Sequence, residues 1–329
     1  MNGGACVGPG SAAGVETMNA VPRTRAARVR ESVITVALAY VLFASASIAG
    51  AQVVNPADKV PEASQPTPTD DTHHTWAMPA IEVTGKAPLV EEDRIGDYLQ
   101  PRWTAHRRFS ETRVYVIPKG MVEFEYWLRP TTPKDGGPTD FLTQYEVEFG
   151  LPGRFQLDLY AVGHKEGSDG QFAIDGQKVE VRWAFADWGK IWGNPTAYVE
   201  WAQNSTAADN LELKLLLGGE IVSGWHWGSN FVWDHQTGDA EETSREWTTG
   251  VSRTVKDTKF GLGFETQLAF VNELDANTGI RSDMSHEFLV GPSVQIRPLP
   301  QMHIDFAPLF GTTEESPRSK VFVVLGWEF

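Results

Sequence analysis

Acidic side chains recur at every second position in several stretches of this 329-residue chain. Glu123 and Glu125 stand two residues apart, and Glu146 and Glu148 repeat the spacing. In an extended strand, alternate side chains point to the same side, so each pair would present both carboxylates on one face. Rings of such carboxylates favour cations in a water-filled pore. Paired carboxylates also perform glycoside hydrolysis, but almost any two of these acids fit that description, so the spacing identifies no catalytic pair.

Serine and histidine offer a second chemistry, the hydrolysis of lipids, which requires the two side chains to lie next to each other. Ser229 and His235 would share one strand face but stand six residues apart, about 20 Å at the rise of a strand. His286 and His303 have no obvious serine neighbour. The chain also lacks a Gly-x-Ser-x-Gly elbow, a phosphate-binding loop and a dinucleotide fingerprint. We therefore predict no catalytic residues and no cofactor, and keep a lipid-modifying enzyme as the third alternative.

The acidic residues belong to segments in which apolar and polar side chains alternate with a period of two, the pattern of a β-strand with two unlike faces. Twelve such segments follow one another, beginning at residues 121, 141, 153, 175, 195, 210, 227, 244, 258, 284, 300 and 319. Their length and even number suit a transmembrane barrel. We predict an all-β fold, an antiparallel up-and-down barrel of about 12 strands over residues 112–329. A soluble sandwich or lipocalin-like barrel is the alternative, but it accounts less well for so many charges on the polar face.

The connections between these segments alternate in length. Connections after odd-numbered strands are long and rich in Gly, Asp, Asn and Thr, whereas several after even-numbered strands are tight, such as Leu151-Pro-Gly153. This is the arrangement of barrels with both termini in the periplasm. The two longer even-numbered turns contain Trp188, Trp192, Trp225 and Trp227, which we expect to anchor the barrel at one membrane interface.

If the apolar faces meet lipid, the charged residues on the opposite faces line the lumen. The predicted lumen-lining residues, and the candidate solute path, are Glu123, Glu125, Glu146, Glu148, Asp158, Glu180, Arg182, Glu200, Glu212, Lys214, Asp234, Glu246, Glu265 and Asp305. The set is strongly acidic. It predicts a pore that prefers cations or neutral solutes, or, with equal weight, a lumen closed by internal ion pairs.

The N-terminal residues have the features of an export signal. Four arginines between Arg23 and Arg30 precede the apolar run Val33 to Ile48, and small residues stand before Gln52. We predict a cleaved signal peptide over residues 1–51, with Met18 a better start than Met1. The only cysteine, Cys6, falls inside it. Without this segment the balance of 28 basic against 43 acidic residues becomes 24 against 41. So acidic a protein is not expected to bind nucleic acid.

Residues 52–111 are rich in proline and polar residues and have too little apolar content for a core of their own. We predict a disordered periplasmic tether. Within it, Ile81-Glu-Val-Thr-Gly85 resembles the first segment of TonB-dependent receptors, but those receptors need a far larger barrel than this chain can form, and an ordinary solvated stretch explains the segment better. His73-His74 lies in the same polar company, and we expect no metal site there.

The last nine residues alternate again and end on a phenylalanine. Val321, Val323, Leu325, Trp327 and Phe329 share one strand face. This ending resembles the C-terminal signal of bacterial outer-membrane barrels, in which Trp327 and Phe329 would be read by the barrel-assembly machinery.

Three further segments resemble uncharacterised outer-membrane barrels assigned to transport, including the family named for a phenol-degradation pathway. They are Pro118-Lys-Gly120, residues 148–159, and residues 214–220 together with 226–234. The resemblance implies the architecture and a Gram-negative outer-membrane location, with membrane lipid and small solutes as partners, but it brings no active residues.

These observations together predict an exported outer-membrane pore or small-solute transporter. The first alternative is a closed barrel that serves as a structural or surface-interaction module.

Overall fold

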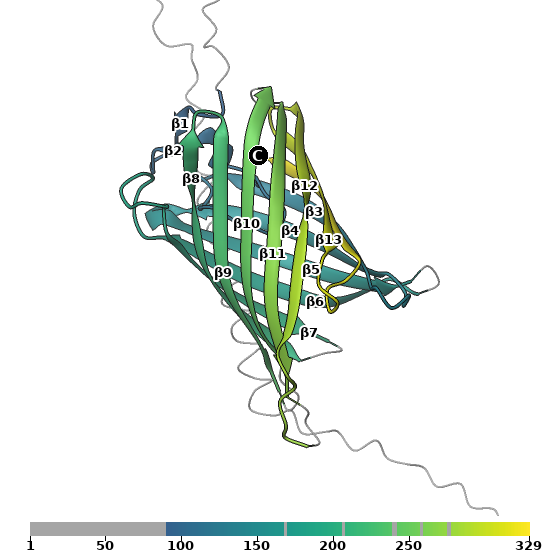
Figure 1. The fold of residues 1–329 in the computed structure, drawn as a ribbon. Coiled ribbons are helices and arrows are strands. Elements are labelled where there is room, and N and C mark those ends of the chain that lie inside the picture. Colours follow the sequence, from purple (N-terminus) through teal and green to yellow (C-terminus); the bar gives the residue numbers. More distant parts are fainter. Residues whose placement is uncertain (1–89, 168–169, 206–207, 239–241, 257–258, 275–277) are drawn as a thin grey trace, which may run out of the picture. The chain divides into compact units, whose positions relative to one another are not determined.

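The computed structural model describes residues 90–167, 170–205, 208–238, 242–256, 259–274 and 278–329. The predicted signal peptide and most of the predicted tether lie outside these residues. Twelve long strands, β3 to β14, pair antiparallel in sequence order, and β14 pairs with β3 to close the barrel. Figure 1 shows the wall that these strands form. The predicted fold is confirmed in architecture, strand number and up-and-down order.

The strand bounds lie within a few residues of the predicted segments. The barrel strands are β3 (Val122–Thr132), β4 (Asp140–Leu151), β5 (Phe155–Glu166), β6 (Ala173–Ala184), β7 (Thr196–Asn204), β8 (Asp209–Val222), β9 (Trp225–Thr237), β10 (Glu242–Lys256), β11 (Phe260–Glu273), β12 (Ser285–Leu299), β13 (Met302–Gly311) and β14 (Ser319–Glu328). Two short strands and two 3-10 turns complete the described elements: β1 (Arg94–Ile95), β2 (Gln100–Pro101), η1 (Arg102–Thr104) and η2 (Pro152–Arg154).

The two faces of the barrel wall differ in the way that the alternating sequence requires. Large apolar side chains such as Phe124, Val199 and Phe264 are exposed on the outside, whereas Glu123 and Glu125 are buried on the inside. An outer surface so rich in exposed apolar side chains is typical of a protein that meets lipid, not water. No helix within the described part of the chain is both long and apolar enough to cross a membrane.

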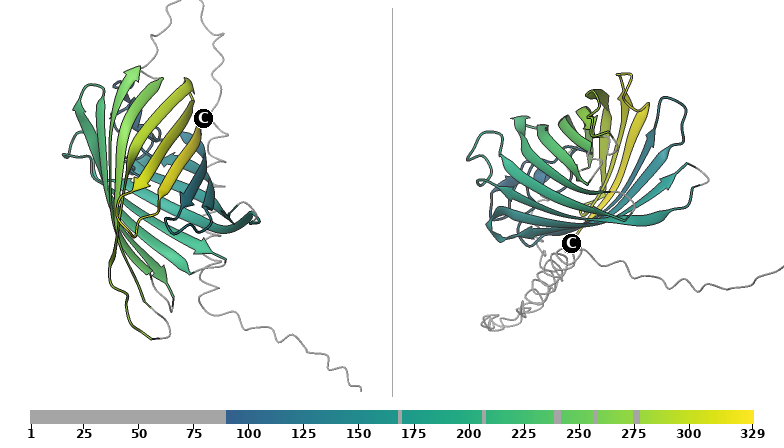
Figure 2. Two further views of the ribbon diagram at one scale, coloured as in Figure 1. Left: turned by 45° about the vertical axis from the view of Figure 1, so that its right-hand side comes forward. Right: turned by 90° about the horizontal axis from the view of Figure 1, so that it is seen from below.

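The ends of the barrel differ in their connections. One end, called the turn end below, has the short connections after β4, β8, β10 and β12, the longer connection after β6 (residues 185–195) and the C-terminal residue Phe329. The other, called the loop end, has the long connections after β3, β5, β7, β9, β11 and β13. The two further views in Figure 2 show the hairpins that project at the loop end. The predicted segregation of short and long connections is therefore observed except after β6; the turn between β8 and β9, which was also predicted to be longer, is short because Trp225 and Trp227 belong to β9.

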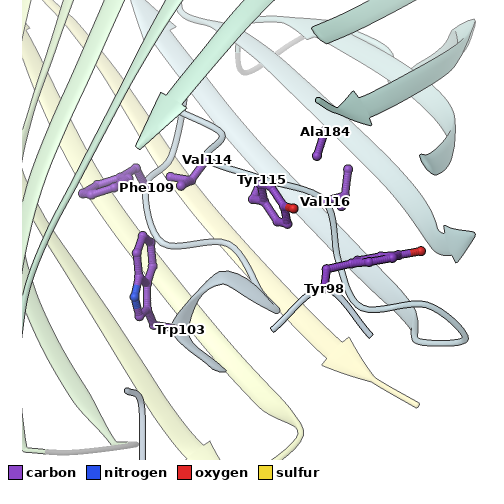
Figure 3. Close-up of a cluster of buried hydrophobic side chains, with 7 residues drawn as sticks. All are labelled: Tyr98, Trp103, Phe109, Val114, Tyr115, Val116 and Ala184. Carbon is purple, nitrogen blue, oxygen red and sulfur yellow. The ribbon is translucent and has the colours of Figure 1, made fainter. Parts of the chain in front are cut away.

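Residues 90–121, called the plug below, enter the barrel at the turn end; most of residues 100–118 are buried inside it, whereas Leu99 and Lys119 remain exposed. Trp103, Phe109 and Val116 in this segment are fully buried, and Figure 3 shows them within a cluster that also includes Ala184 of β6. The sequence predicted that residues 90–111 belong to a solvated tether. They do not, because this segment packs against the barrel wall. They have too few apolar residues to form a core alone, but the barrel wall supplies the partners.

Candidate functional site

The plug meets the turn-end half of the lumen through ion pairs that are almost completely removed from water. Arg113 Nη2 lies 2.8 Å from Glu146 Oε1, 3.1 Å from Glu148 Oε1 and 3.6 Å from Glu125 Oε2. The three carboxylates come from the neighbouring strands β3 and β4 and are at most 1% exposed. A buried charge without a partner is very costly, so acids and arginine require one another here. Burial of the Arg113 guanidinium lowers its pKa, but the three carboxylates outweigh this effect and raise the pKa well above its ordinary value. Arg113 therefore remains positively charged.

A second plug arginine reinforces the same carboxylates. Arg107 donates from Nε and Nη2 to Glu125, with Nη2 to Oε2 at 2.6 Å, and Nη2 lies 3.3 Å from Glu146 Oε2. Its guanidinium stacks 3.7 Å above the ring of Trp127, whose Nε1 donates to both acids at 3.0 Å. Fork-like geometry and stacking are properties of arginine that lysine lacks.

The opposite wall of the lumen is made of glycine where the plug approaches most closely. Gly218, Gly228 and Gly250 lie directly beside one another on β8, β9 and β10. A Cβ atom on Gly250 would stand 2.3 Å from Phe109, and one on Gly218 would stand 2.4 Å from Val114. Because these three glycines have no side chains, they leave the space that the apolar part of the plug occupies. They are called the glycine row below.

Hydrogen bonds fix the backbone of the plug between these two walls. The amide of Asn230 accepts from the N–H of Arg113 and donates to its carbonyl, both at 2.7 Å. Glu265 accepts from the N–H and the hydroxyl of Ser110 at 2.9 and 2.6 Å. Two cavities that remain between plug and wall measure about 20 and about 10 Å³, each no larger than a single water. The plug therefore fills this half of the lumen.

Two histidines face each other at the turn end. His303 on β13 bonds to Glu123 through Nε2 at 2.7 Å and to Asp305 through Nδ1, while His106 of the plug lies 5.9 Å from its ring. Burial lowers the pKa of His106 well below its ordinary value, and the positive charges of Arg297 and His303 act in the same direction. His106 is therefore neutral at neutral pH.

The loop-end half of the lumen is different, because water reaches its side chains. We call it the vestibule; its charged wall residues include Arg129, Lys178, Glu200, Glu212, Lys214 and Lys320. Lys178 pairs with Glu200 at 3.0 Å and Lys214 with Glu212 at 2.8 Å. Arg129 is 30% exposed and faces Glu111 of the plug, 20% exposed, at 3.7 Å. The plug thus ends in a carboxylate where the wall carries bases.

Three groups of wall acids approach one another as metal ligands do, and one of them includes His303. These residues already have partners, however: Arg107 and Arg113 bind Glu125, Glu146 and Glu148, Arg182 binds Asp158 and Glu180, and Glu123 is paired with His303. Guanidinium and imidazole groups thus stand where a metal ion would bind, and we assign no metal to these groups.

The structure directs all fourteen predicted lumen residues into the barrel. Nine of them lie in the plugged half or at its boundary, namely Glu123, Glu125, Glu146, Glu148, Asp158, Glu180, Arg182, Glu265 and Asp305. Glu200, Glu212, Lys214, Asp234 and Glu246 line the vestibule. The plugged set does not form a solute path in the described state, because the plug occupies that space. Ser229 and His235 bond to Trp247 and Thr243 respectively, and they are not brought together.

The four tryptophans predicted to anchor the barrel do not all lie outside. Trp192 is 81% exposed and packs on Trp227 with ring centroids 5.7 Å apart, and Trp225 is also exposed. Trp188 instead packs edge-on against Trp103 and Tyr115 of the plug. Its prediction as an interface anchor is wrong, because the plug offers its ring an apolar partner inside the barrel. Trp327 and Phe329 of the predicted assembly signal are exposed at the turn end.

The partners of the acids were not predicted from the sequence. Arg107, Arg108 and Glu111 fall in the predicted tether, Arg113 falls just after it and before the first predicted strand, and Lys178 and Lys320 were left out of the lumen set. The available signal was the cluster of arginines between residues 102 and 113 in an otherwise acidic chain, interleaved with Trp103 and Phe109.

Searches of protein-family models and of curated protein sequences give no match. Among solved structures, an outer membrane channel from Pseudomonas putida F1 is similar with 8% identity and a TM-score of 0.49, over 68% of this chain and 100% of that chain. The KdgM porin has 8% identity and a TM-score of 0.45, over 63% and 99% of the two chains. The NanC porin has 12% identity and a TM-score of 0.43, over 63% and 98%. Values this low do not identify a function, and the resemblance to the phenol-degradation family stays a prediction.

Proposed function

We propose that this protein is an outer-membrane channel for small solutes, held closed at its periplasmic end by residues 90–121. The apolar outer wall supports the membrane location, and the export signal and C-terminal residues of the sequence agree with it. The observation that carries the proposal is the charge match between plug and wall. Burial of carboxylates is costly, and a barrel filled with apolar side chains would not need Glu125, Glu146 and Glu148. They suit a polar lumen that a removable arginine-bearing segment can close.

The open form prefers cations and neutral solutes in this proposal. Withdrawal of the plug removes Arg107 and Arg113 and leaves the carboxylates of β3 and β4 facing water. A narrow passage lined by unpaired carboxylates concentrates cations and excludes anions. The lumen preference therefore belongs to the unplugged state.

Recording in planar bilayers tests this function. The full chain is expected to give little steady conductance, and a variant lacking residues 90–117 is expected to conduct steadily with cations favoured over anions. Lys119→Gln, which changes only an exposed ion pair with Asp97, serves as the control and should behave as the full chain. A deletion variant that shows heat-modifiable mobility on gels but does not conduct would instead support the closed structural barrel. Anion selectivity would contradict the proposed lumen preference.

A further inference from the structure

The tip of the plug presents a single carboxylate to a group of bases in the vestibule. Arg129 of β3, Lys178 of β6, Lys214 of β8 and Lys320 of β14 reach the field of Glu111 from four different strands. Burial raises the pKa of Glu111, but these positive charges outweigh it and lower the pKa below its ordinary value. Glu111 therefore lies within electrostatic range of all four bases, and Arg129 is its close partner.

Two of the four bases have other carboxylates as close partners, and within the described part of the chain the other two do not. Lys178 and Lys214 are bound by Glu200 and Glu212. Lys320 donates to the neutral amide of Gln267 at 3.0 Å, although Glu287 lies within its field. Arg129 reaches Glu111 only at 3.7 Å, and its Nε is buried without a hydrogen-bond partner among the described residues. The guanidinium thus has donor capacity that Glu111 does not use.

Arg129 and Lys320 are neighbours across one strand pair. Lys320 stands opposite Thr131 in the register of β14 and β3, and Arg129 is two residues from Thr131 on the same inner face. Diagonal neighbours at this spacing lie within the reach of long side chains. Their charged ends can therefore close on one carboxylate, for which arginine provides paired donors in a fixed fork.

We propose that Arg129 and Lys320, with Lys178 and Lys214 beside them, form a binding site for the carboxylate of a small solute, and that Glu111 occupies this site while the plug is seated. The solute carboxylate and Glu111 compete for the same donors. Binding of the solute and seating of the plug therefore oppose each other, and the coupling is reciprocal. The vestibule also carries Asp234 and Glu246, so a net-neutral solute with both an ammonium and a carboxylate group fits it better than a simple anion.

The site can be measured on the full chain in detergent micelles by saturation-transfer NMR. Acetate probes the carboxylate alone, glycine the carboxylate with an ammonium, and glucose neither. Glu111→Gln removes the internal competitor and is expected to tighten acetate and glycine binding by roughly tenfold, since a competitor that occupies a site most of the time lowers apparent affinity by that occupancy. Glucose should show no change. Tighter glycine than acetate binding identifies the amphoteric source, and the reverse order identifies a simple anion.

Two further variants make the result decisive. Glu314→Gln removes an exposed acid of the β13–β14 loop and should leave all affinities unchanged, which excludes an effect of net charge. Arg129→Gln added to Glu111→Gln should abolish the gain. If Glu111→Gln leaves carboxylate binding unchanged while heat-modifiable mobility shows an intact barrel, the inference is overturned. The inference rests on the plug geometry of the proposed function, but the binding measurement does not depend on conductance. A protein that does not conduct would contradict the channel function without contradicting the carboxylate site.

Discussion

The two halves of the lumen are built from the same strands, but the signs of the paired charges on the wall and on the plug are reversed between them. In the turn-end half the wall is acidic and buried, and the plug supplies Arg107 and Arg113. In the vestibule the plug supplies Glu111, and the wall supplies four bases within reach of water. The plug thus changes the sign of its charge within a few residues to follow the wall.

The difference in burial sets how strongly each contact holds the plug. Ion pairs shielded from water are costly to break, whereas partly exposed pairs are worth about 1 kcal/mol or less. The turn-end contacts therefore seat the plug, and the Glu111 contact is weak enough for a solute to replace. The following changes are expected to separate the two.

Arg113→Gln should have the largest effect. It leaves Glu146 and Glu148 buried without their main cation, for which a loss of about 3–5 kcal/mol in plug seating is expected. Hydrogen exchange of the backbone amides of residues 98–117, measured on the full chain in detergent, should rise accordingly. Lys119→Gln is the matched control, because that side chain is exposed. Unchanged exchange in Arg113→Gln would mean that the buried pairs do not hold the plug.

Gly250→Ala should displace the apolar side of the plug without altering any charged residue. Its Cβ would stand 2.3 Å from Phe109, and such overpacking costs about 1–3 kcal/mol. We expect increased channel opening in bilayers and a barrel that still resists unfolding at low temperature on gels. Gly238→Ala, in the β9–β10 loop with 3.6 Å to its nearest neighbour, is the control. Equal opening in the two variants would contradict the proposed role of the glycine row.

Acid should weaken the turn-end contact through His106. The seated histidine has a pKa well below 6.5, whereas in the unseated plug it returns to that ordinary value. The unseated state then binds the proton more readily, so seating is fully stable above pH 6.5 and is lost progressively below it, by up to about 1.4 kcal/mol per pH unit. Hydrogen exchange of the plug between pH 7.5 and 5.5 measures this. His106→Gln should flatten the dependence, and an unchanged pH profile in that variant would assign the effect to other groups.

Trp192→Ala should have the smallest effect on the plug, within about 0.5 kcal/mol, because that ring is exposed on the outer surface. Trp188→Ala provides the contrast, since its ring packs on Trp103 and Tyr115 inside the lumen. Hydrogen exchange of the plug should rise only in the second variant. The same rise in both would place Trp188 and Trp192 in one role, as the sequence had suggested.

The barrel could be predicted from the sequence because its signal is local. Alternation within each strand, as in Val122 to Leu128, and the length of each connection are both visible without knowledge of distant residues. The polar face could be assigned to the lumen for the same reason.

The plug could not be predicted in this way. Residues 90–121 lack periodicity, and their apolar side chains are too few to form a core unless a wall 100 or more residues away supplies Gly250 and Asn230. Arg107 and Arg113 are meaningful only once Glu125 and Glu146 are placed beside them. The prediction for Trp188 failed for the same reason. An aromatic ring near a turn suits a membrane interface and a buried contact with the plug equally well.

Cross-linking the plug to the wall tests the central claim most directly. Thr112 Oγ1 of the plug lies 3.0 Å from Thr248 Oγ1 of β10, so Thr112→Cys with Thr248→Cys places two thiols within bonding range. Mild oxidation of the full chain in the membrane should form this disulfide, and a reductant should then restore whatever opening the unlinked protein shows. Pairing Thr112→Cys with Thr131→Cys, on the wall of the vestibule, should give no bond. Thiols at positions 112 and 248 that stay free and reactive under the same oxidation would contradict the account, because the segment would then lie elsewhere.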